Sequence, residues 1–179
     1  ERDYDEFVSY FENRFPDTPF EDYKNGVYSI DKSAREQWEA MEEFPPYELN
    51  VDRGEELFNR PFKNGNTYGS CFENDGIGIR QNYPYFDTEK NKVVTLEGAL
   101  NDCRVKNGEK PLSYFKGKEL AHVSAYMAYT SRGNKFNIQI PNTKEALDAY
   151  EDGRRLYFTK KGQLNFCLLY TSPSPRDHQ

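Results

Sequence analysis

A pentapeptide that occurs twice constrains the fold of this chain more than any other feature. Gly54-Glu-Glu-Leu-Phe58 in the first half of the sequence returns as Gly153-Arg-Arg-Leu-Tyr157 in the second half. In each copy a Leu and an aromatic residue share one face of a short predicted helix, and a loop rich in Lys, Gly and Asn then leads to a cysteine, Cys71 or Cys167. Two such units about a hundred residues apart favour two small domains, the second of them incomplete.

A short helix followed by a cysteine loop is also how a c-type cytochrome presents its haem-attachment motif, Cys-x-x-Cys-His. Neither copy completes that motif, because Cys71 is followed by Phe72, Glu73, Asn74 and Asp75. Met127 and His122 remain as alternative iron ligands. A Met on an apolar helical stripe is more typical of a core, and a single His is more typical of a surface or capping group. The cysteine-loop domain is therefore predicted to lack haem.

Composition allows a core and argues against some partners. The mean hydropathy is -1.00 and 30% of the residues are charged, but 14 Tyr and 13 Phe supply enough large side chains for a core. The net charge of -6 and the lack of a basic run argue against nucleic acid and anionic membranes as partners. No stretch approaches the roughly 20 apolar residues of a membrane span. The start at Glu1, without Met or a signal-like segment, predicts a mature or truncated end.

Helical periodicity and capping residues predict most of the secondary structure. Trp38 is expected to lie in a core, and the helix that contains Gly54 is expected to begin at a cap on Asp52. Gly133 is expected at the position that follows the helix C-cap. The predicted helices are residues 3–15; a helix capped by Asp31 or Ser33; one from Asp52 to Arg60; one capped by Thr95 with Leu96, Ala99, Leu100 and Cys103 on one face; residues 117–133 with Leu120, Val123 and Met127 buried; and one capped by Asn142 or Thr143.

Non-helical segments are predicted from alternation and turn residues. Phe136-Asn-Ile-Gln-Ile140 alternates like a short strand that closes the first domain. Residues 65–92 are rich in Gly, Pro and Asn and show no sustained periodicity, so they are expected to form a long loop held by aromatic contacts from Tyr83, Tyr85 and Phe86. The small residues Ala121, Ala125 and Ala128 form a row that would let another helix approach closely.

Cys71 and Cys103 form an even pair with 31 residues between them. In an exported protein they could form a disulfide, and in a cytosolic protein they could be two free buried thiols, so the residues alone leave both open. A zinc site is unfavoured, because it needs four ligands and only His122 could join the two cysteines. No nucleophile–base pair, Walker loop or dinucleotide fingerprint is present.

The last residues, from Cys167 through Ser-Pro-Ser-Pro to His178 and Gln179, are similar to the translation of a transposase adapter used in short-read library preparation. Residues 167–179 are therefore expected to be a sequencing artefact, with a natural Ser/Pro tail as the alternative. On this interpretation neither Cys167 nor His178 is evidence for a metal site.

Five ordered motifs between Tyr28 and Phe166 together resemble SoxA, the c-type cytochrome subunit of the SoxAX complex of thiosulfate-oxidising bacteria. The motifs are Val51-Asp-Arg-Gly-Glu-Glu-Leu-Phe58, the run from Gly78 to Asp87, Asn101-Asp-Cys-Arg104, the run from Leu120 to Gly133, and the run from Gly153 to Phe166. The resemblance implies a mainly α, periplasmic protein. It implies an N-terminal arm over 1–27, a cytochrome c-like domain without haem over 28–140, and the truncated start of a second, haem-binding cytochrome c-like domain over 141–166.

The resemblance also implies specific roles for the cysteines. Members with two haems have Cys-x-x-Cys-His beginning at the position of Cys71 and an axial ligand at that of Cys103. This chain resembles the one-haem members, in which these two cysteines form a disulfide. The single haem c motif is then expected just after Phe166, as is the active-site cysteine further along. No catalytic, cofactor-binding or metal-ligating residue is thus expected within the chain, which as written is expected to bind no haem and to be inactive.

The function implied for the complete protein is oxidative conjugation of thiosulfate to a cysteine of the carrier SoxY. A SoxX-type cytochrome c subunit would be the partner, and electrons would pass through c-type haem. Two alternatives are a non-catalytic cytochrome-like interaction module, which would dock through the aromatic loop from Tyr83 to Phe86, and a simple electron-transfer cytochrome with a Met or His axial ligand further along the chain.

Overall fold

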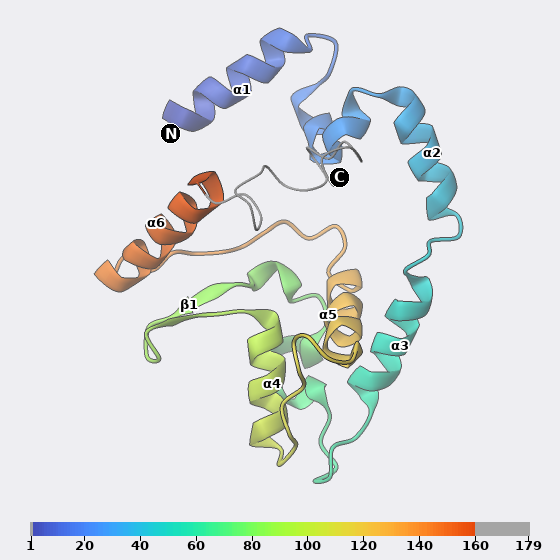
Figure 1. Ribbon diagram of the computed structural model, residues 1–179, viewed down its shortest axis with the longest axis vertical. Coiled ribbons are helices and arrows are strands. Elements are labelled where there is room, and N and C mark those ends of the chain that lie inside the picture. Colours follow the sequence, from blue (N-terminus) through green and yellow to red (C-terminus); the bar gives the residue numbers. More distant parts are fainter. Residues whose placement is uncertain (1, 160–179) are drawn as a thin grey trace, which may run out of the picture. The chain divides into compact units, whose positions relative to one another are not determined.

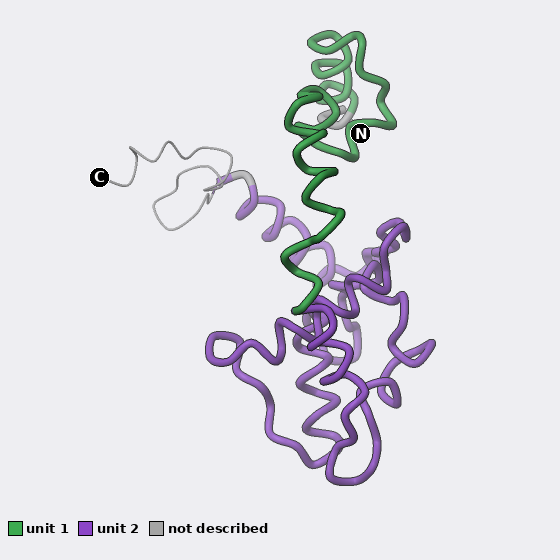
Figure 2. Tube along the Cα trace, turned by 90° about the vertical axis from the view of Figure 1, so that its right-hand side faces the viewer, with its two compact units in different colours: residues 1–49 green, residues 50–179 purple. Residues whose placement is uncertain are grey.

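The computed structural model describes residues 2–159, and the fold is mainly α, as predicted (Figure 1). The chain forms two compact units, residues 1–49 and 50–179 (Figure 2). The elements are α1 (Arg2–Arg14), the 3-10 segment η1 (Phe20–Ser29), α2 (Lys32–Glu42), α3 (Glu48–Asn59), the short 3-10 turns η2 (Tyr68–Cys71), η3 (Glu73–Gly76) and η4 (Arg80–Asn82), β1 (Tyr85–Asp87), β2 (Lys92–Val94), α4 (Leu96–Lys106), α5 (Glu119–Tyr129) and α6 (Lys144–Thr159).

The first unit consists of α1, η1 and α2 and has no core among its described side chains. The predicted cap of α2 is confirmed, because the Asp31 carboxylate accepts a hydrogen bond from the Ala34 N–H at 2.9 Å. Trp38 was expected in a core and is only half-buried; its ring stacks on Tyr28 with 5.7 Å between centroids. Met41, on the same stripe, is 55% exposed. The core prediction for Trp38 is wrong because no described side chain of residues 5–49 is buried.

The second unit has its core between α3, α4 and α5. The cap of α4 is confirmed, since Thr95 Oγ1 accepts a hydrogen bond from the Gly98 N–H at 3.1 Å. The predicted inner faces of α4 and α5 are confirmed as well, except that Ala99 is half-buried. The core side chains are Leu57, Phe58, Phe62, Tyr68, Ile79, Leu96, Leu100, Cys103, Leu120, Val123 and Met127.

The contact between α3 and α5 depends on a glycine. A Cβ added to Gly54 would lie 2.1 Å from the backbone oxygen of His122, so only glycine allows this approach. The predicted row Ala121, Ala125 and Ala128 is not used by α3; it lines an open groove of about 410 Å³ next to Tyr114.

Several predicted boundaries are wrong. The helix that contains Gly54 begins at Glu48, after a turn in which the Glu48 N–H donates to the Pro45 carbonyl at 3.0 Å, so Asp52 lies inside the helix. The helix α5 has its C-cap at Thr130, and Gly133 lies three residues further on, in the turn after the helix, with φ +82°. A turn therefore separates the glycine from the helix end.

A two-stranded antiparallel sheet occurs where a long loop was predicted. Phe86 of β1 pairs with Val93 of β2, and the connecting turn is closed by Asp87, whose carboxylate accepts hydrogen bonds from the N–H groups of Glu89 and Lys90 at 3.0 and 2.9 Å. The predicted strand Phe136–Ile140 is wrong: the segment belongs to no described strand, and Asn137 donates one backbone hydrogen bond to Gln81.

The last described helix, α6, begins at the predicted cap, since Thr143 Oγ1 accepts a hydrogen bond from the Ala146 N–H at 3.3 Å. Ala146 is buried, whereas Leu156 and Tyr157 are 41% and 68% exposed. Between residues 2 and 159, none of the helices combines the length and the apolar character that crossing a bilayer requires.

Candidate functional site: the cysteine pair and its surroundings

The cysteine loop and α4 meet at a disulfide. After α3 the chain runs through a loop into η2, which ends at Cys71, and α4 places Cys103 on its buried inner face. The two sulfur atoms are bonded, with 5.9 Å between the Cα atoms. The pairing implied by the resemblance is therefore present in the structure. It takes up both cysteine thiols of residues 2–159, which could otherwise act as ligands or nucleophiles.

The side chain of Asn107 links this disulfide to the neighbouring loop through hydrogen bonds. The Nδ2 of Asn107 donates to the Cys103 carbonyl at 2.9 Å and also lies 3.4 Å from the Cys71 sulfur and 3.7 Å from the Cys103 sulfur. Its Oδ1 accepts from the Nδ2 groups of Asn64 and Asn66 at 2.7 and 2.9 Å. Asn107 is 8% exposed, so its hydrogen bond to the Cys103 carbonyl is shielded from water, whereas those from Asn64 and Asn66 are only partly buried.

Sequence reasoning missed the role of Asn107. The available signal was the pair of short Asn-Gly segments, Asn64-Gly-Asn66 and Asn107-Gly108, since Asn side chains commonly close turns on their neighbours. The amide is neutral and does not titrate. It provides neither an acid nor a base beside the sulfurs, and the arrangement is that of a structural disulfide.

Arg104 forms the polar edge of the same site. Its guanidinium donates to the Tyr68 hydroxyl at 3.2 Å and to the Lys110 carbonyl at 2.8 Å, and it lies 3.8 Å from the Glu109 carboxylate. Burial raises the pKa of Tyr68, and the hydrogen bond from Arg104 opposes that shift. Tyr68 therefore stays a neutral phenol at the wall of a small cavity of about 180 Å³, which Phe62 and Arg104 also line.

The residues present do not fit a haem at this position. A c-type haem needs a second thiol and an axial His, and Phe72 to Asp75 supply neither. Cys71 is in the disulfide. The adjoining interior is filled by side chains: Phe58 stacks on Tyr68 with 6.0 Å between ring centroids, and an added Cβ on Gly76 would lie 2.7 Å from the Phe58 ring.

The alternative ligands are not assembled into a site either. Met127 is fully buried within the core, which confirms its interpretation as a core residue. His122 lies outside that core cluster, and its Nε2 is buried without a hydrogen-bond partner among the described residues. Within residues 2–159 no three His, Cys, Asp or Glu side chains are grouped so that they could hold a metal ion. Phe166, Cys167 and His178 lie outside the described residues.

The segment that contains α4, α5 and both cysteines matches a known family. The family model described as "SoxA/TsdA, cytochrome c domain" matches residues 53–136. The chain carries a cytochrome c domain of the SoxA/TsdA family. This confirms the resemblance drawn from the five motifs and the predicted cytochrome c-like fold.

Similar proteins extend the match beyond the SoxA/TsdA-type domain. L-cysteine S-thiosulfotransferase subunit SoxA of Chlorobaculum tepidum is 52% identical over 159 residues, 89% of this chain and 54% of that protein. The subunit of the same name in Allochromatium vinosum is 49% identical over 171 residues, 93% of this chain and 60% of that protein. The crystal structure of SoxXA from P. pantotrophus superposes with a TM-score of 0.57 at 25% identity, covering 70% of this chain and 48% of that one. The chain spans about half the length of the relatives it matches.

Proposed function

We propose that this chain is part of a SoxA-type subunit that, together with a SoxX-type cytochrome c, joins thiosulfate to a cysteine of the carrier protein SoxY. The observation that carries the proposal is the identity of about one half, over about nine tenths of the chain, to subunits named L-cysteine S-thiosulfotransferase SoxA. A solved structure with a related fold is that of SoxXA, which supports a SoxX-type partner.

The proposed reaction forms one sulfur–sulfur bond and releases two electrons. A carrier cysteine thiolate and the terminal sulfur of thiosulfate would combine to give a cysteine S-thiosulfonate, and the two electrons released would pass to an acceptor. The haem supplies the electron acceptor when it is bound. No residue of this chain is assigned to the chemical step, because both thiols of the described part are in the disulfide.

The described residues would then support the reaction by holding the architecture. Residues 28–140 would form a haemless cytochrome c-like domain, stabilised by the disulfide and the Asn107 hydrogen bonds instead of a cofactor. The second domain would begin at residue 141 and carry the only haem c, held by a motif just after Phe166. A disulfide between residues far apart in the sequence is typical of exported proteins, which supports a periplasmic location.

The test is to complete the open reading frame from an uncontaminated assembly and to express the full protein in a host that attaches c-type haem. The expected result is one covalent haem per chain by mass and by absorption spectrum, with thiosulfate-dependent modification of a SoxY cysteine when SoxX is added. A gene without Cys-x-x-Cys-His within a few codons of Phe166 would contradict the proposal.

The second candidate is a non-catalytic interaction module, which the misfit of haem beside Cys71 favours. The loop that was expected to dock partners is partly covered, since Tyr83 packs against the core and Tyr85 and Phe86 line a groove of about 480 Å³ with α6. Haem content separates the two candidates, because a completed protein without haem could only bind partners.

A further inference from the structure

The described part of the first unit, residues 5–49, buries none of its side chains, although it is rich in aromatic and aliphatic residues. Helices as short as α1 and α2 are marginal in water unless one face packs against another surface. Below about 40 residues a chain usually needs external support to fold, and a unit of residues 1–49 is only slightly longer than that. The most exposed of the large apolar side chains in this unit are Phe44 at 85%, Leu49 at 80%, Phe7 at 64%, Tyr10 at 63% and Val27 at 62%.

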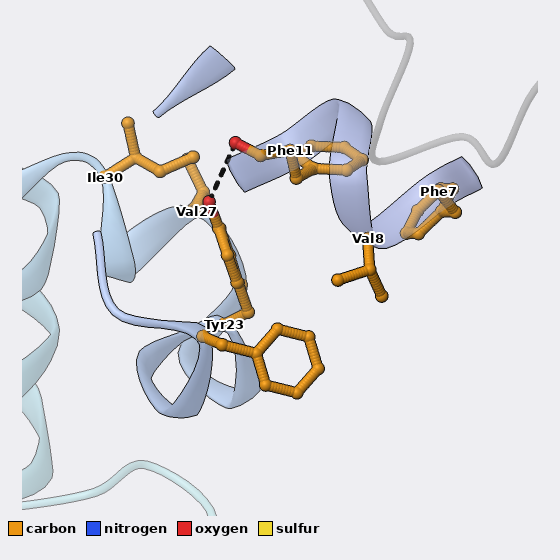
Figure 3. Close-up of a pocket in the computed structure, with 8 residues that line it drawn as sticks. Phe7, Val8, Phe11, Tyr23, Val27 and Ile30 are labelled. Carbon is orange, nitrogen blue, oxygen red and sulfur yellow. Dashed lines mark hydrogen bonds between the residues drawn. The ribbon is translucent and has the colours of Figure 1, made fainter. Parts of the chain in front are cut away.

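Some of these side chains form an apolar groove within the unit. The groove has a volume of about 450 Å³ and lies between α1 and η1 (Figure 3). Its two walls are joined by a hydrogen bond from the Tyr23 hydroxyl to the Phe11 carbonyl at 3.0 Å, and the rings of these two residues are 6.0 Å apart. The side chains labelled in Figure 3 are Phe7, Val8 and Phe11 from one wall and Tyr23, Val27 and Ile30 from the other.

The apolar lining of this groove suits a helix. Phe7 and Phe11 are one helical turn apart and their rings are 4.8 Å apart, so they form a continuous apolar ridge along α1. Gly26 has φ +58° and nothing within 4 Å of an added Cβ, so the opposite wall stays open where the chain turns. A groove lined by aromatic and aliphatic side chains is the surface on which an amphipathic helix places its apolar face.

Charge decides what kind of helix fits. Residues 1–49 contain 14 acidic residues and 5 Lys or Arg, whereas residues 50–179 contain 16 and 19. Exposed carboxylates lie on both elements that form the groove, at Asp5 and Glu12 on α1 and at Glu21 and Asp22 on η1. Such a surface attracts a positively charged partner and repels an acidic helix or an anionic lipid surface.

We propose that the first unit is a docking element that binds a partner protein through a lysine- or arginine-rich amphipathic helix, whose apolar face enters the groove between α1 and η1. The exposed carboxylates of α1 and η1 would pair with the basic side chains of that helix. The same contact would bury Phe7 and Val27, which the unit itself leaves exposed. This inference does not depend on the sulfur chemistry of the complete protein.

Fluorescence anisotropy with the full chain tests the proposal. The probe is a labelled synthetic amphipathic helix with Leu along one face and Lys along the other, and the control probe is the same peptide with Glu in place of Lys. The Lys probe is expected to bind, with an affinity that falls as salt is raised, and the Glu probe is expected not to bind. Equal binding of both probes, or no binding of the Lys probe because the chain covers its own groove, would overturn the proposal.

A matched pair of variants tests the groove itself. Phe7→Ala is expected to weaken the Lys probe about tenfold, since truncating a central aromatic residue of an interface commonly costs that much. Phe44→Ala removes an even more exposed Phe of the same unit that does not line the groove, and is expected to leave the affinity unchanged. Neither residue is buried, so the fold is retained. Equal losses in the two variants would show non-specific adhesion and refute the docking site.

Backbone hydrogen exchange locates the contact without mutation. On adding the Lys probe, the amides of residues 5–30 are expected to gain protection, because a bound helix would order α1 and η1. Residues 96–106 of α4 serve as the reference and are expected to be unchanged. Protection that rises on α4 or α5 instead would place the acidic binding surface elsewhere and overturn the proposal.

Discussion

Removing the Cys71–Cys103 disulfide is expected to destabilise the SoxA/TsdA-type domain by about 3–4 kcal/mol. The two cysteines are 32 residues apart in the sequence. In the chain-entropy treatment, a cross-link that closes a loop of this length restricts the unfolded chain by about 12 cal/mol/K, or about 3.7 kcal/mol at 25 °C. This is a large fraction of the roughly 5–15 kcal/mol by which a domain is stable.

The assay is urea unfolding of the oxidised protein, the reduced protein and the double variant Cys71→Ala/Cys103→Ala. All three carry Cys167→Ser, so that no third thiol can exchange with the pair. With a urea m-value of about 1–3 kcal/mol/M, the midpoint is expected to fall by about 1–4 M on reduction and by a similar amount in the double variant. The reductant is expected to have no effect on the double variant, which controls for its other actions.

Two results would refute this reasoning. Coinciding midpoints for the oxidised and reduced proteins would mean that the cross-link does not constrain the unfolded chain. Titration of two free thiols in the unfolded, unreduced Cys167→Ser protein would mean that Cys71 and Cys103 are not paired, and the structural substitute for haem would be lost.

Three other changes test the packing around the site, each measured by urea unfolding. Gly54→Ala is expected to cost about 1–3 kcal/mol of stability, because its Cβ would meet the His122 backbone oxygen at 2.1 Å. The control Gly153→Ala has nothing within 4 Å of its added Cβ and is expected to be neutral or stabilising by about 0.5–1 kcal/mol. Equal effects of the two variants would contradict the close contact of α3 and α5 at Gly54. Asn107→Ala is expected to cost about 1–3 kcal/mol of stability, since the Asn64 and Asn66 amides lose their acceptor. The control is Asn134→Ala at an exposed position, and an equal cost of the two variants would refute this prediction. Burial raises the pKa of Tyr83 to about 12, whereas an unfolded tyrosine titrates near 10, so the unfolded chain releases this proton at a lower pH than the folded chain does. The stability due to neutral Tyr83 is therefore present below about pH 10 and is lost as the pH rises toward 12. Tyr83→Phe is expected to remove that part of the alkaline decrease in the free energy of unfolding.

The helices could be predicted because their signals are local. Asp31, Thr95 and Thr143 each accept a hydrogen bond from an N–H three residues further on, so the cap and the helix that it begins are encoded within one turn. The start of α3 was missed because it lacks such a side-chain signal: the Glu48 N–H at its first residue donates to the Pro45 carbonyl instead.

Strand pairing could not be predicted from alternation alone. Phe136–Ile140 alternates between apolar and polar residues, which favours extended backbone, but a strand also needs a neighbour, and the described hairpin pairs only with itself. The turn of the hairpin is closed by the Asp87 carboxylate. Its strands were not predicted because three residues are too few to show a periodic pattern.

The cysteine site, too, could be predicted only in part. Cys71 and Cys103 are visible in the sequence, and their pairing was implied by the resemblance to SoxA and not by the residues themselves. The hydrogen bonds of Asn107 join residues 41 and 43 positions apart, so they exist only once α4 has packed against the cysteine loop. A sequence pattern therefore identifies the thiols, while tertiary packing determines what surrounds them.

The repeated pentapeptide shows how one pattern can have two outcomes. In α3 the Leu57 and Phe58 side chains are 7% and 3% exposed, and Gly54 is pressed against α5. In α6 the matching Leu156 and Tyr157 are 41% and 68% exposed. Both copies form a helix, but only the helix of the first copy is crossed by another helix at its glycine, and no helix among residues 2–159 crosses α6 at that point.

The longer relatives suggest where the missing partner of α6 comes from. If residue 141 begins a second cytochrome c-like domain, a later helix of the completed protein would cross α6 at Gly153 as α5 crosses α3 at Gly54. Gly153→Ala, neutral or mildly stabilising in the present chain, is then expected to cost about 1–3 kcal/mol in the completed protein, measured by the urea midpoint of its haem absorbance. Phe44→Ala, far from this crossing in sequence, is the control. The same small effect of Gly153→Ala in both proteins would mean that the pentapeptide repeat does not mark a second domain of the same fold.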